Sequence, residues 1–313
     1  MEIKMLTAPF DSVEFLDLVE KTFGREEREL EEVQINGSES KYNSDVVFIS
    51  IEEDTILGTL HVTIPNSAPY LAGLSAMLTT PEARGKGIGT ALFSEAMKFI
   101  DSKGIELAVL GTSNPIAAKM YSKFGFSYAF GSGVMMRFSA GHQVDFNNNY
   151  LDSPCGNISV KKGDPSLIIP IGPLTLYKTG FLINDLNTNL VSFEIMTQFS
   201  CMGLFPRYLN LYDKGGDFYY AADERGVVGA VASVLPSLEG NRVDFFFSHG
   251  FESSLRDLIS AIETDRKNIF FEVAKNDAIK ANIVKALDYT AEEESSYEYR
   301  GFSIPTVKYS TKT

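Results

Sequence analysis

A short basic loop rich in glycine is the part of this sequence with the clearest chemistry. Residues 83–92 are ARGKGIGTAL, and they stand between a β-rich stretch and a segment of helical periodicity. Glycines at a strand-to-helix turn leave backbone N–H groups accessible, and the following helix adds the positive end of its dipole. Arg84 and Lys86 add cationic side chains that can make charge-assisted hydrogen bonds. The spacing predicts a binding site for a bulky anion that carries phosphate.

Two common phosphate-binding loops do not fit this spacing. The pattern GxxxxGKS or GxxxxGKT fails, because no glycine stands at the required distance before such a tripeptide. The pattern GxGxxG, started at Gly85, needs a glycine where Thr90 stands. The pattern that remains is R-x-x-G-x-G, filled by Arg84, Gly87 and Gly89.

The segments around the loop alternate between strand and helix patterns. Residues 46–64 predict an antiparallel hairpin around a polar turn, and residues 71–79 predict a third strand. Four more elements follow the loop: a helix ending at Gly104, a buried strand over 105–113, a helix from Asn114-Pro115 to Gly125, and a β pair over 126–140. We therefore expect an α/β (α+β) fold with a mixed, mostly antiparallel central sheet flanked by helices.

The third strand has two different faces. Its even positions are apolar and its odd positions are small or mixed, which is the alternation of a strand with one face in the core. The even positions are Ala72, Leu74, Ala76 and Leu78, and the odd ones are Gly73, Ser75, Met77 and Thr79. We expect the odd face to line a site.

Composition narrows the class of protein. A chain of 313 residues that is 44% hydrophobic is long enough for roughly two domains. The first residues lack the apolar core of a signal peptide, and prolines and a lysine interrupt the most apolar later run, 166–183. We therefore expect a cytoplasmic protein that does not enter a membrane. The formal net charge of −13 argues against nucleic acid as a partner and suits a cationic ligand.

Metal and disulfide chemistry have no support in the sequence. Cys155 and Cys201 are the two cysteines, they stand far apart, and no CxxC or Cys/His spacing lies near them. We expect no zinc site and no disulfide scaffold.

The pattern of the first half repeats in the second half. Residues 141–156, rich in Asn, Gly and Asp, predict a linker. Beyond it a hairpin carries Gly229 in the place of Gly58, and a later helix follows Asn276 as the first follows Asn114. The second copy is nine residues shorter between these landmarks. We expect the shortening at the glycine loop, where the second copy has no basic pair and has Glu252 in the turn.

Two segments in this order resemble the GNAT superfamily of acyl-CoA-dependent N-acetyltransferases. LTTPEARGKGIGTALFSEAM is similar to its pyrophosphate-binding motif, and NPIAAKMYSKFGF is similar to its later helix with a Gly-Phe end. The resemblance covers residues 1–140 and implies acetyl-CoA as cosubstrate without a metal. It also implies a tandem arrangement, with residues 157–313 as a degenerate GNAT-like copy that binds CoA poorly. That copy would shape the acceptor pocket or form a homodimer.

The resemblance assigns roles to particular residues. Backbone amides of the loop would hold the CoA pyrophosphate, and the strand before it would part from its neighbour and offer the backbone of Met77 and Thr79 to the pantetheine arm. The loop residues are Arg84, Gly85, Lys86, Gly87, Ile88, Gly89 and Thr90. Asn114 would contact the cofactor, or serve only as a helix cap. Tyr121 would protonate the departing thiolate, or only pack on its neighbours.

The base that would deprotonate the amine is not identified by the sequence. Gly73 and Ser75 stand where the family often has a carboxylate, so we expect the proton to leave through ordered water. Glu52, Glu53 and Asp54 fall in a hairpin turn, and His61 on a strand favours a structural role. The acidic run GREERELEEVQ, 24–34, could attract a cationic amine, but it is more typical of a solvated helix face.

Three functions remain open at this point. The first is acetyl transfer by direct attack of a small-molecule primary amine. The second is protein or peptide N-acetylation, and the third is a non-catalytic acyl-CoA sensor in which Tyr121 is structural.

Overall fold

The computed structural model describes residues 2–129, 132–139, 147–191, 198 and 200–311. The chain forms two compact units. Unit 1 contains Met1–Val144 with two later segments, Asp164–Pro170 and Thr197–Gly203, and unit 2 contains the remaining residues. The predicted linker begins at 141–146, which lie outside the described residues, and the predicted domain limits at 140 and 157 stay predictions.

Unit 1 is built on a seven-stranded sheet in the order β1-β2-β3-β4-β5-β7-β6. Only β4 and β5 pair in parallel, and the other described neighbours are antiparallel. The strands are β1 (Glu2–Thr7), β2 (Asn43–Glu52), β3 (Thr55–Pro65), β4 (Leu71–Thr79), β5 (Leu107–Gly111), β6 (Ser127–Tyr128) and β7 (Val134–Phe138). The expected mixed, mostly antiparallel sheet is confirmed.

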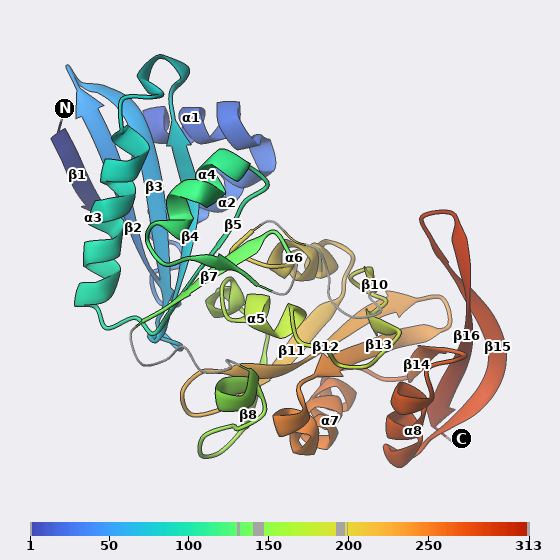
Figure 1. Ribbon diagram of the computed structural model, residues 1–313. Helices are drawn as coiled ribbons and strands as arrows, with labels where there is room; N and C mark the ends of the chain where they lie inside the picture. The colour runs from blue at the N-terminus through green and yellow to red at the C-terminus, as the bar shows by residue number, and fades with distance from the viewer. Residues whose placement is uncertain (1, 130–131, 140–146, 192–197, 199, 312–313) are drawn as a thin grey trace. The chain divides into compact units, whose positions relative to one another are not determined.

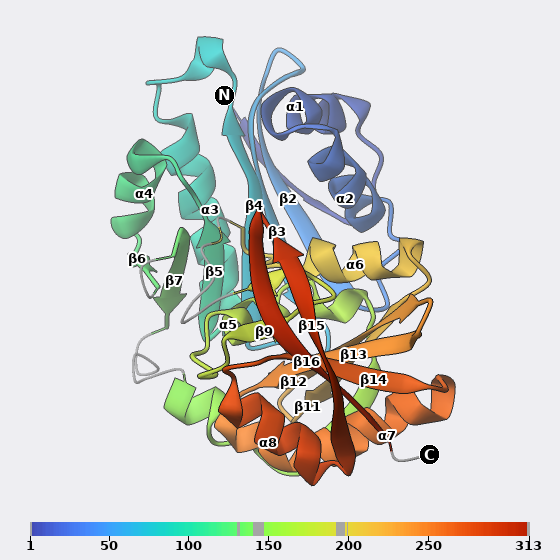
Figure 2. The same ribbon diagram turned by 90° about the vertical axis from the view of Figure 1, so that its right-hand side faces the viewer.

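Two pairs of helices flank this sheet on opposite faces (Figure 2). The helices are α1 (Val13–Phe23) and α2 (Arg25–Ile35) on one face, and α3 (Ile88–Ser102) and α4 (Pro115–Ser122) on the other. α3 buries an apolar stripe that includes Leu92, Phe93 and Ile100, as its periodicity predicts. α4 ends at Ser122 and continues as a turn to Gly125, so the helix is shorter than expected.

The expectation that the even positions of β4 share one face is wrong, because β4 contains a β-bulge. The pairing of β3 with β4 shifts register between Thr59 and His61, and Ala76 has a φ of +45°. A bulge places an extra residue on one strand and so reverses the alternation beyond it. Leu74 therefore packs in the α3 core, whereas Ala76 and Leu78 pack in the α1 core.

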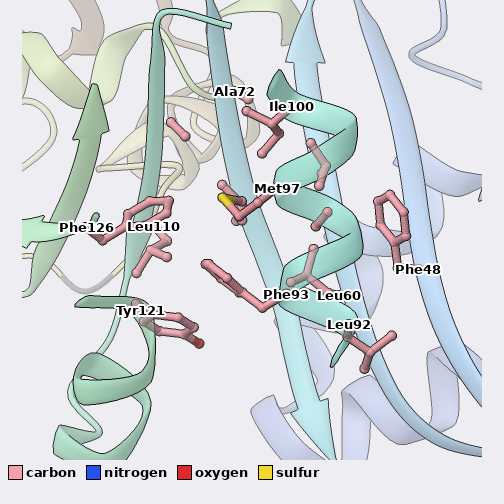
Figure 3. Close-up of a cluster of buried hydrophobic side chains, with 14 of the residues drawn as sticks. Phe48, Leu60, Ala72, Leu92, Phe93, Met97, Ile100, Leu110, Tyr121 and Phe126 are labelled. Atoms are coloured by element: carbon pink, nitrogen blue, oxygen red, sulfur yellow. The ribbon is translucent and has the colours of Figure 1, made fainter. Parts of the chain in front are cut away.

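The α3 core carries the aromatic side chains nearest to the predicted site. The rings of Phe93 and Tyr121 face one another between α3 and α4, with centroids 4.8 Å apart (Figure 3). Phe126, from the predicted Gly-Phe segment, packs edge-on against Phe93 at 5.6 Å. These contacts fix α4 and the segment after it against α3, because buried aromatic pairs of this kind are specific in geometry.

Unit 2 contains a second seven-stranded sheet, in the order β15-β16-β14-β13-β12-β11-β8. Its strands are β8 (Ser159–Lys162), β11 (Asp217–Ala222), β12 (Val228–Ser237), β13 (Gly240–Phe247), β14 (Ile269–Ala274), β15 (Tyr289–Tyr299) and β16 (Phe302–Thr311). Here too a single parallel pair, β13 with β14, interrupts antiparallel neighbours in the described sheet. Taken in chain order, the seven strands have the same neighbours as those of unit 1.

The helices of unit 2 also fall at corresponding places in the chain. They are α5 (Ile171–Thr175) and α6 (Phe205–Asp213) before the hairpin, α7 (Leu255–Asp265) after the fourth strand and α8 (Ala278–Ala286) after the fifth (Figure 1). A two-stranded sheet of β9 (Ile183–Asp185) and β10 (Leu190–Val191) stands between α5 and α6 in sequence. In the described parts, no helix is long and apolar enough to cross a bilayer.

One detail of the predicted repeat is wrong, namely the place of the shortening. The later helix does follow Asn276, and it is capped by Asp277, whose carboxylate accepts the Lys280 N–H at 3.0 Å. The shortening does not fall mainly at the turn after the fourth strand: α7 has 11 residues where α3 has 15. Both hairpins have a register shift near the predicted glycine, but Gly58 pairs with Ser50 beside its shift, whereas Gly229 is the residue skipped at the other, so their equivalence stays a prediction.

Candidate active site

The parallel strands β4 and β5 separate in the middle of the first sheet. They pair from Leu71–Leu74 to Leu107–Leu110, and beyond these residues they diverge. Ser75–Thr79 and Gly111–Asn114 then line a cavity of about 1080 Å³. The separation that the resemblance implied is present, and it leaves the β5-facing backbone of β4 open to a ligand.

The glycine loop closes one end of this cavity. Gly85 and Gly87 have φ values of +76° and +80°, and Gly87 is the N-cap of α3 without a capping side chain. The N–H groups of Ile88, Gly89 and Thr90 belong to the first turn of α3, where N–H groups have no partner within the helix. A site of this kind suits an anion, because amides and helix dipole both point at it.

Most of the predicted site residues line this cavity. Lys86 is exposed and is not among the lining residues. Those that line it are Met77, Thr79, Arg84, Gly85, Gly87, Ile88, Gly89, Thr90, Asn114 and Tyr121. Gly89 approaches the strand closely: a Cβ added there would lie 3.1 Å from the Met77 Cε. The structure brings these residues together, and their roles stay predictions.

Asn114 and Tyr121 each have a structural task as well. The Asn114 Oδ1 accepts the Ile116 N–H at 2.9 Å and so caps α4, as predicted for this Asn-Pro pair. Tyr121 is 6% exposed, and burial raises the pKa of its phenol to about 12. A phenol with that pKa stays protonated at neutral pH and can donate a hydrogen bond.

The acidic run on α2 is not the solvated face that we expected. Glu26 and Glu32 are exposed, but Glu31 is 1% exposed and Glu27 lines the cavity. The Ser75 hydroxyl of β4 donates to the Glu31 Oε1 at 2.9 Å. Glu27 and Glu31 are four residues apart and share a helix face. Sequence reasoning missed them because the neighbouring acids make the whole helix look polar.

His61 of β3 stands between two carboxylates in the core. Its Nδ1 donates to the Glu31 Oε2 at 2.6 Å and its Nε2 donates to the Asp45 Oδ1 at 3.0 Å. Both ring nitrogens must donate, since an ionised carboxylate can only accept. Burial lowers the pKa of His61, but the two carboxylates outweigh it and raise the pKa to about 10. His61 is therefore a buried imidazolium and has the structural role predicted for it.

We expect this imidazolium to make the stability of unit 1 fall with rising pH. The folded state keeps the His61 proton up to a pKa of about 10, whereas the unfolded state loses it at 6.5. The stabilisation is complete below pH 6.5 and is lost as the pH rises to about 10, with a slope of at most about 1.4 kcal/mol per pH unit. Calorimetric melting across this range should show the slope in the wild type, and His61→Gln should reduce it. An unchanged slope in the variant would contradict the assignment.

Part of the cavity wall comes from the second half of the sequence. Ser200 and Cys201 line the cavity, and both belong to unit 1. A Cβ added at Gly73 would lie 2.2 Å from the Ile169 Cδ1 and 3.4 Å from the Cys201 Sγ. Gly73 is therefore required for these segments to pack on β4. Burial raises the pKa of the Cys201 thiol, which keeps it neutral.

Residues 12–126, which include the separated strands and the glycine loop, match the sequence model of the acetyltransferase (GNAT) family. They form a GNAT acetyltransferase domain. Because the chain contains this domain, it is an enzyme of the acetyltransferase class. No curated protein sequence matches the chain.

Three solved structures illustrate what this chain is similar to. GCN5 of Tetrahymena is 12% identical with a TM-score of 0.36, covering 44% of this chain and 96% of its own. PaiA N-acetyltransferase of Thermoplasma acidophilum, solved with coenzyme A, is 21% identical with a TM-score of 0.33, covering 44% and 100%. YncA of Salmonella typhimurium, solved with acetyl-CoA, is 12% identical with a TM-score of 0.37, covering 50% and 93%.

The parallel strands of unit 2, β13 and β14, lie beside another described segment of the chain where they separate. β13 and β14 also pair over a few residues and then diverge, from Asn241–Val243 to Ile269–Phe271. The gap holds the chain's own β9 segment: the Lys280 Nζ donates to the carbonyls of Ile183 and Asn184, both at 2.9 Å. Lys280 also forms a buried ion pair with Asp244 of β13.

Other backbone atoms also lie against the turn after β13. A Cβ added at Gly250 would lie 2.6 Å from the Leu151 carbonyl oxygen, so backbone occupies the space beside this turn. Gly250 lacks the positive φ of Gly85 and Gly87. Phe251 is fully buried and packs against Gly229. The described residues contain no group of His, Cys, Asp and Glu that could hold a metal ion.

Proposed function

We propose that the GNAT domain transfers the acetyl group of acetyl-CoA to the primary amine of a small molecule. The observation that carries the proposal is the gap between β4 and β5, which ends at the glycine loop and opens into one cavity. Residues from both faces of the sheet line that cavity: Thr22, Phe23 and Glu27 from α1 and α2, and the loop, α3 and α4 from the other face. Donor and acceptor can therefore meet within the sheet.

The loop residues fit a diphosphate. The first N–H groups of α3 point at the site, Gly85 and Gly87 place no side chain in it, and Arg84 supplies a cation at the cavity wall. The backbone of Met77 and Thr79 would pair with the amides of the pantetheine arm as an added strand pairs with a sheet edge, once the Arg84 Nε releases the Thr79 carbonyl to which it donates at 3.3 Å. Lys86, which is exposed in the loop, would contribute long-range attraction.

Tyr121 is the residue that would protonate the leaving sulfur. Its pKa of about 12 keeps the proton on the phenol until a thiolate forms beside it. Buried among Phe93 and Phe126, the hydroxyl is in a medium of low dielectric constant, where a hydrogen bond to a developing anion is strong. Asn114 would hold the start of α4, and thereby Tyr121, in position through its cap.

We expect Tyr121→Phe to lower kcat about 100-fold without weakening acetyl-CoA binding. The ring keeps its packing and only the proton donor is lost. Tyr128→Phe, an exposed tyrosine on β6, is the control and should be unchanged. The assay follows release of the CoA thiol. A variant with full kcat would show that Tyr121 is only structural.

The walls of the cavity favour a small acceptor over a protein. Ser200 and Cys201 line the cavity, Cys201 packs beside Gly73 of β4, and Ile169 fills the space at Gly73. The test compares a panel of free amines with peptides that have a free amino terminus. Acetylation of free amines supports the proposal, and acetylation of peptides alone supports protein N-acetylation. Binding of acetyl-CoA without any turnover supports a sensor.

Unit 2 is, in this proposal, a degenerate GNAT copy that binds no acetyl-CoA. Its strand order repeats that of unit 1, which supports a tandem origin. Its equivalent gap is filled by residues 183–184, and its turn at Gly250 is blocked by backbone. The second half of the sequence still contributes to the reaction, because Ser200 and Cys201 line the GNAT cavity.

A further inference from the structure

We infer that the α2 side of the cavity is a site for a cationic primary amine that carries no carboxylate, and that Glu27 is the base that deprotonates it. This inference rests on the proposed function and adds the acceptor class and the base to it. It replaces the expectation that ordered water alone removes the proton.

The cationic and the acidic side chains that line the cavity come from different segments of the chain. The cationic lining residues are Arg84 of the loop proposed to hold the phosphates, Lys119 of α4 and Lys123 directly after α4. Among the described lining residues, Glu27 of α2 is the one carboxylate. An anionic ligand and a cationic one would therefore be drawn to different parts of one cavity.

The buried group of charged side chains near Glu27 has a net negative charge. Glu31 and Asp45 carry two negative charges around the single positive charge of His61, and all three side chains are buried. Ser75 connects this group to the cavity wall, since it lines the cavity and donates to Glu31. A positive ligand is favoured here, and a ligand with its own carboxylate is repelled.

Glu27 is suited to hold and release a proton near neutral pH. Burial and then the charge of Glu31 raise its pKa to about 7, while the imidazolium of His61 opposes them. The other titratable group that interacts with it is the Cys201 thiol, which stays neutral. Glu27 makes no hydrogen bond or ion pair with the other described side chains, so its oxygens are available to a ligand.

The reaction balances with these groups. Glu27 takes one proton from the ammonium, and the nitrogen lone pair of the neutral amine forms a bond to the thioester carbon. The carbon–sulfur bond breaks and the sulfur takes the Tyr121 proton. The phenolate regains a proton from the new amide nitrogen, and Glu27 passes its proton to solvent. The products are the acetamide, the free CoA thiol and one proton.

The acceptor class is tested with two compounds that differ in one carboxylate. Butylamine and γ-aminobutyrate present the same primary amine, and only the second is an anion at its far end. We expect kcat/KM for butylamine to exceed that for γ-aminobutyrate by about tenfold or more. Equal values, or a preference for γ-aminobutyrate, would overturn the assignment of the acceptor class.

The base is tested with Glu27→Gln and its neighbour Glu26→Gln. Glu26 is exposed on the same helix, lies outside the cavity and is the matched control. Glu27→Gln should lower kcat with butylamine about 100-fold and should remove the acidic limb of the pH profile, whose midpoint is near pH 7 in the wild type. His61→Gln should move that midpoint upward, because it removes the charge that lowers the pKa of Glu27.

Acetyl-CoA titration of each variant distinguishes a failure of Glu27 as the base from a failure of the GNAT domain to act as an acetyltransferase. Glu27→Gln and Glu26→Gln should bind acetyl-CoA as the wild type does. Turnover and a pH profile that survive Glu27→Gln would overturn the inference and leave the proposed function intact. A wild-type protein that binds acetyl-CoA and acetylates no amine would overturn both.

Discussion

Gly87→Glu is expected to weaken acetyl-CoA binding at least about 100-fold. Gly87 caps α3 with a φ of +80°, a conformation that costs a residue with a Cβ roughly 1–2 kcal/mol. The added carboxylate would also lie where the phosphates are proposed to bind, at the positive end of the helix. Charge repulsion and lost hydrogen bonds from the first turn would then act together. Isothermal titration of acetyl-CoA gives the change directly.

Gly104→Glu is the matched control for that experiment. Gly104 also has a positive φ, +69°, and a Cβ added at either glycine meets no atom within 4 Å. It follows α3 at its other end, so it adds the same backbone strain and the same charge away from the loop. Acetyl-CoA affinity should be unchanged in this variant. Equal loss in both variants would mean that the effect is general instability, and no loss in Gly87→Glu would contradict the site.

Lys280→Met is expected to destabilise unit 2 by about 3–5 kcal/mol. Lys280 and Asp244 are 2% exposed and form a buried ion pair, and the ammonium also holds two carbonyls of β9. Removal of the ammonium leaves the Asp244 carboxylate buried without its counter-charge. Thermal melting should show a transition lowered by roughly 10 °C. Acetyl-CoA affinity should not change, because the proposed site lies in unit 1.

The pH dependence of Lys280→Met identifies the charge as the cause. Burial raises the pKa of Asp244 in the wild type, and Lys280 opposes this shift. Without Lys280 the pKa rises further, so lowering the pH should protonate Asp244 and reduce the destabilisation. Lys285→Met on the same helix, where the side chain is exposed, should have little effect. A loss of stability that is independent of pH would point to lost packing instead.

The sequence predicts the features that a short stretch of chain specifies. The glycine loop, the helix after it and the Asn-Pro cap each depend on neighbours within a few residues. The structure has all three, with positive φ at Gly85 and Gly87 and a capping bond from Asn114. Tyr121 lines the cavity for the same reason, because its place on α4 follows from where the helix starts.

The features that the sequence does not predict join distant residues. Glu31 and His61 are 30 residues apart, and nothing in either segment marks the contact. The even positions of β4 are apolar on both sides of the bulge at Ala76. The sequence pattern therefore does not show that these side chains change from one face of the sheet to the other at the bulge. The segment that fills the gap in unit 2 is bound through Lys280, 97 residues beyond Ile183. Such contacts depend on tertiary packing, which the periodicity of apolar residues and the spacing of motifs do not reveal.

Hydrogen–deuterium exchange with and without acetyl-CoA tests the central claim most directly, which is that one of two similar units binds the cofactor. We predict slower exchange at residues 84–91 and 111–117, where the loop and the start of α4 line the cavity. We predict no change at 248–256 and 275–281, the corresponding parts of unit 2, where the chain's own residues fill the gap. Protection of the unit 2 segments, or no protection of the loop in unit 1, would contradict the account.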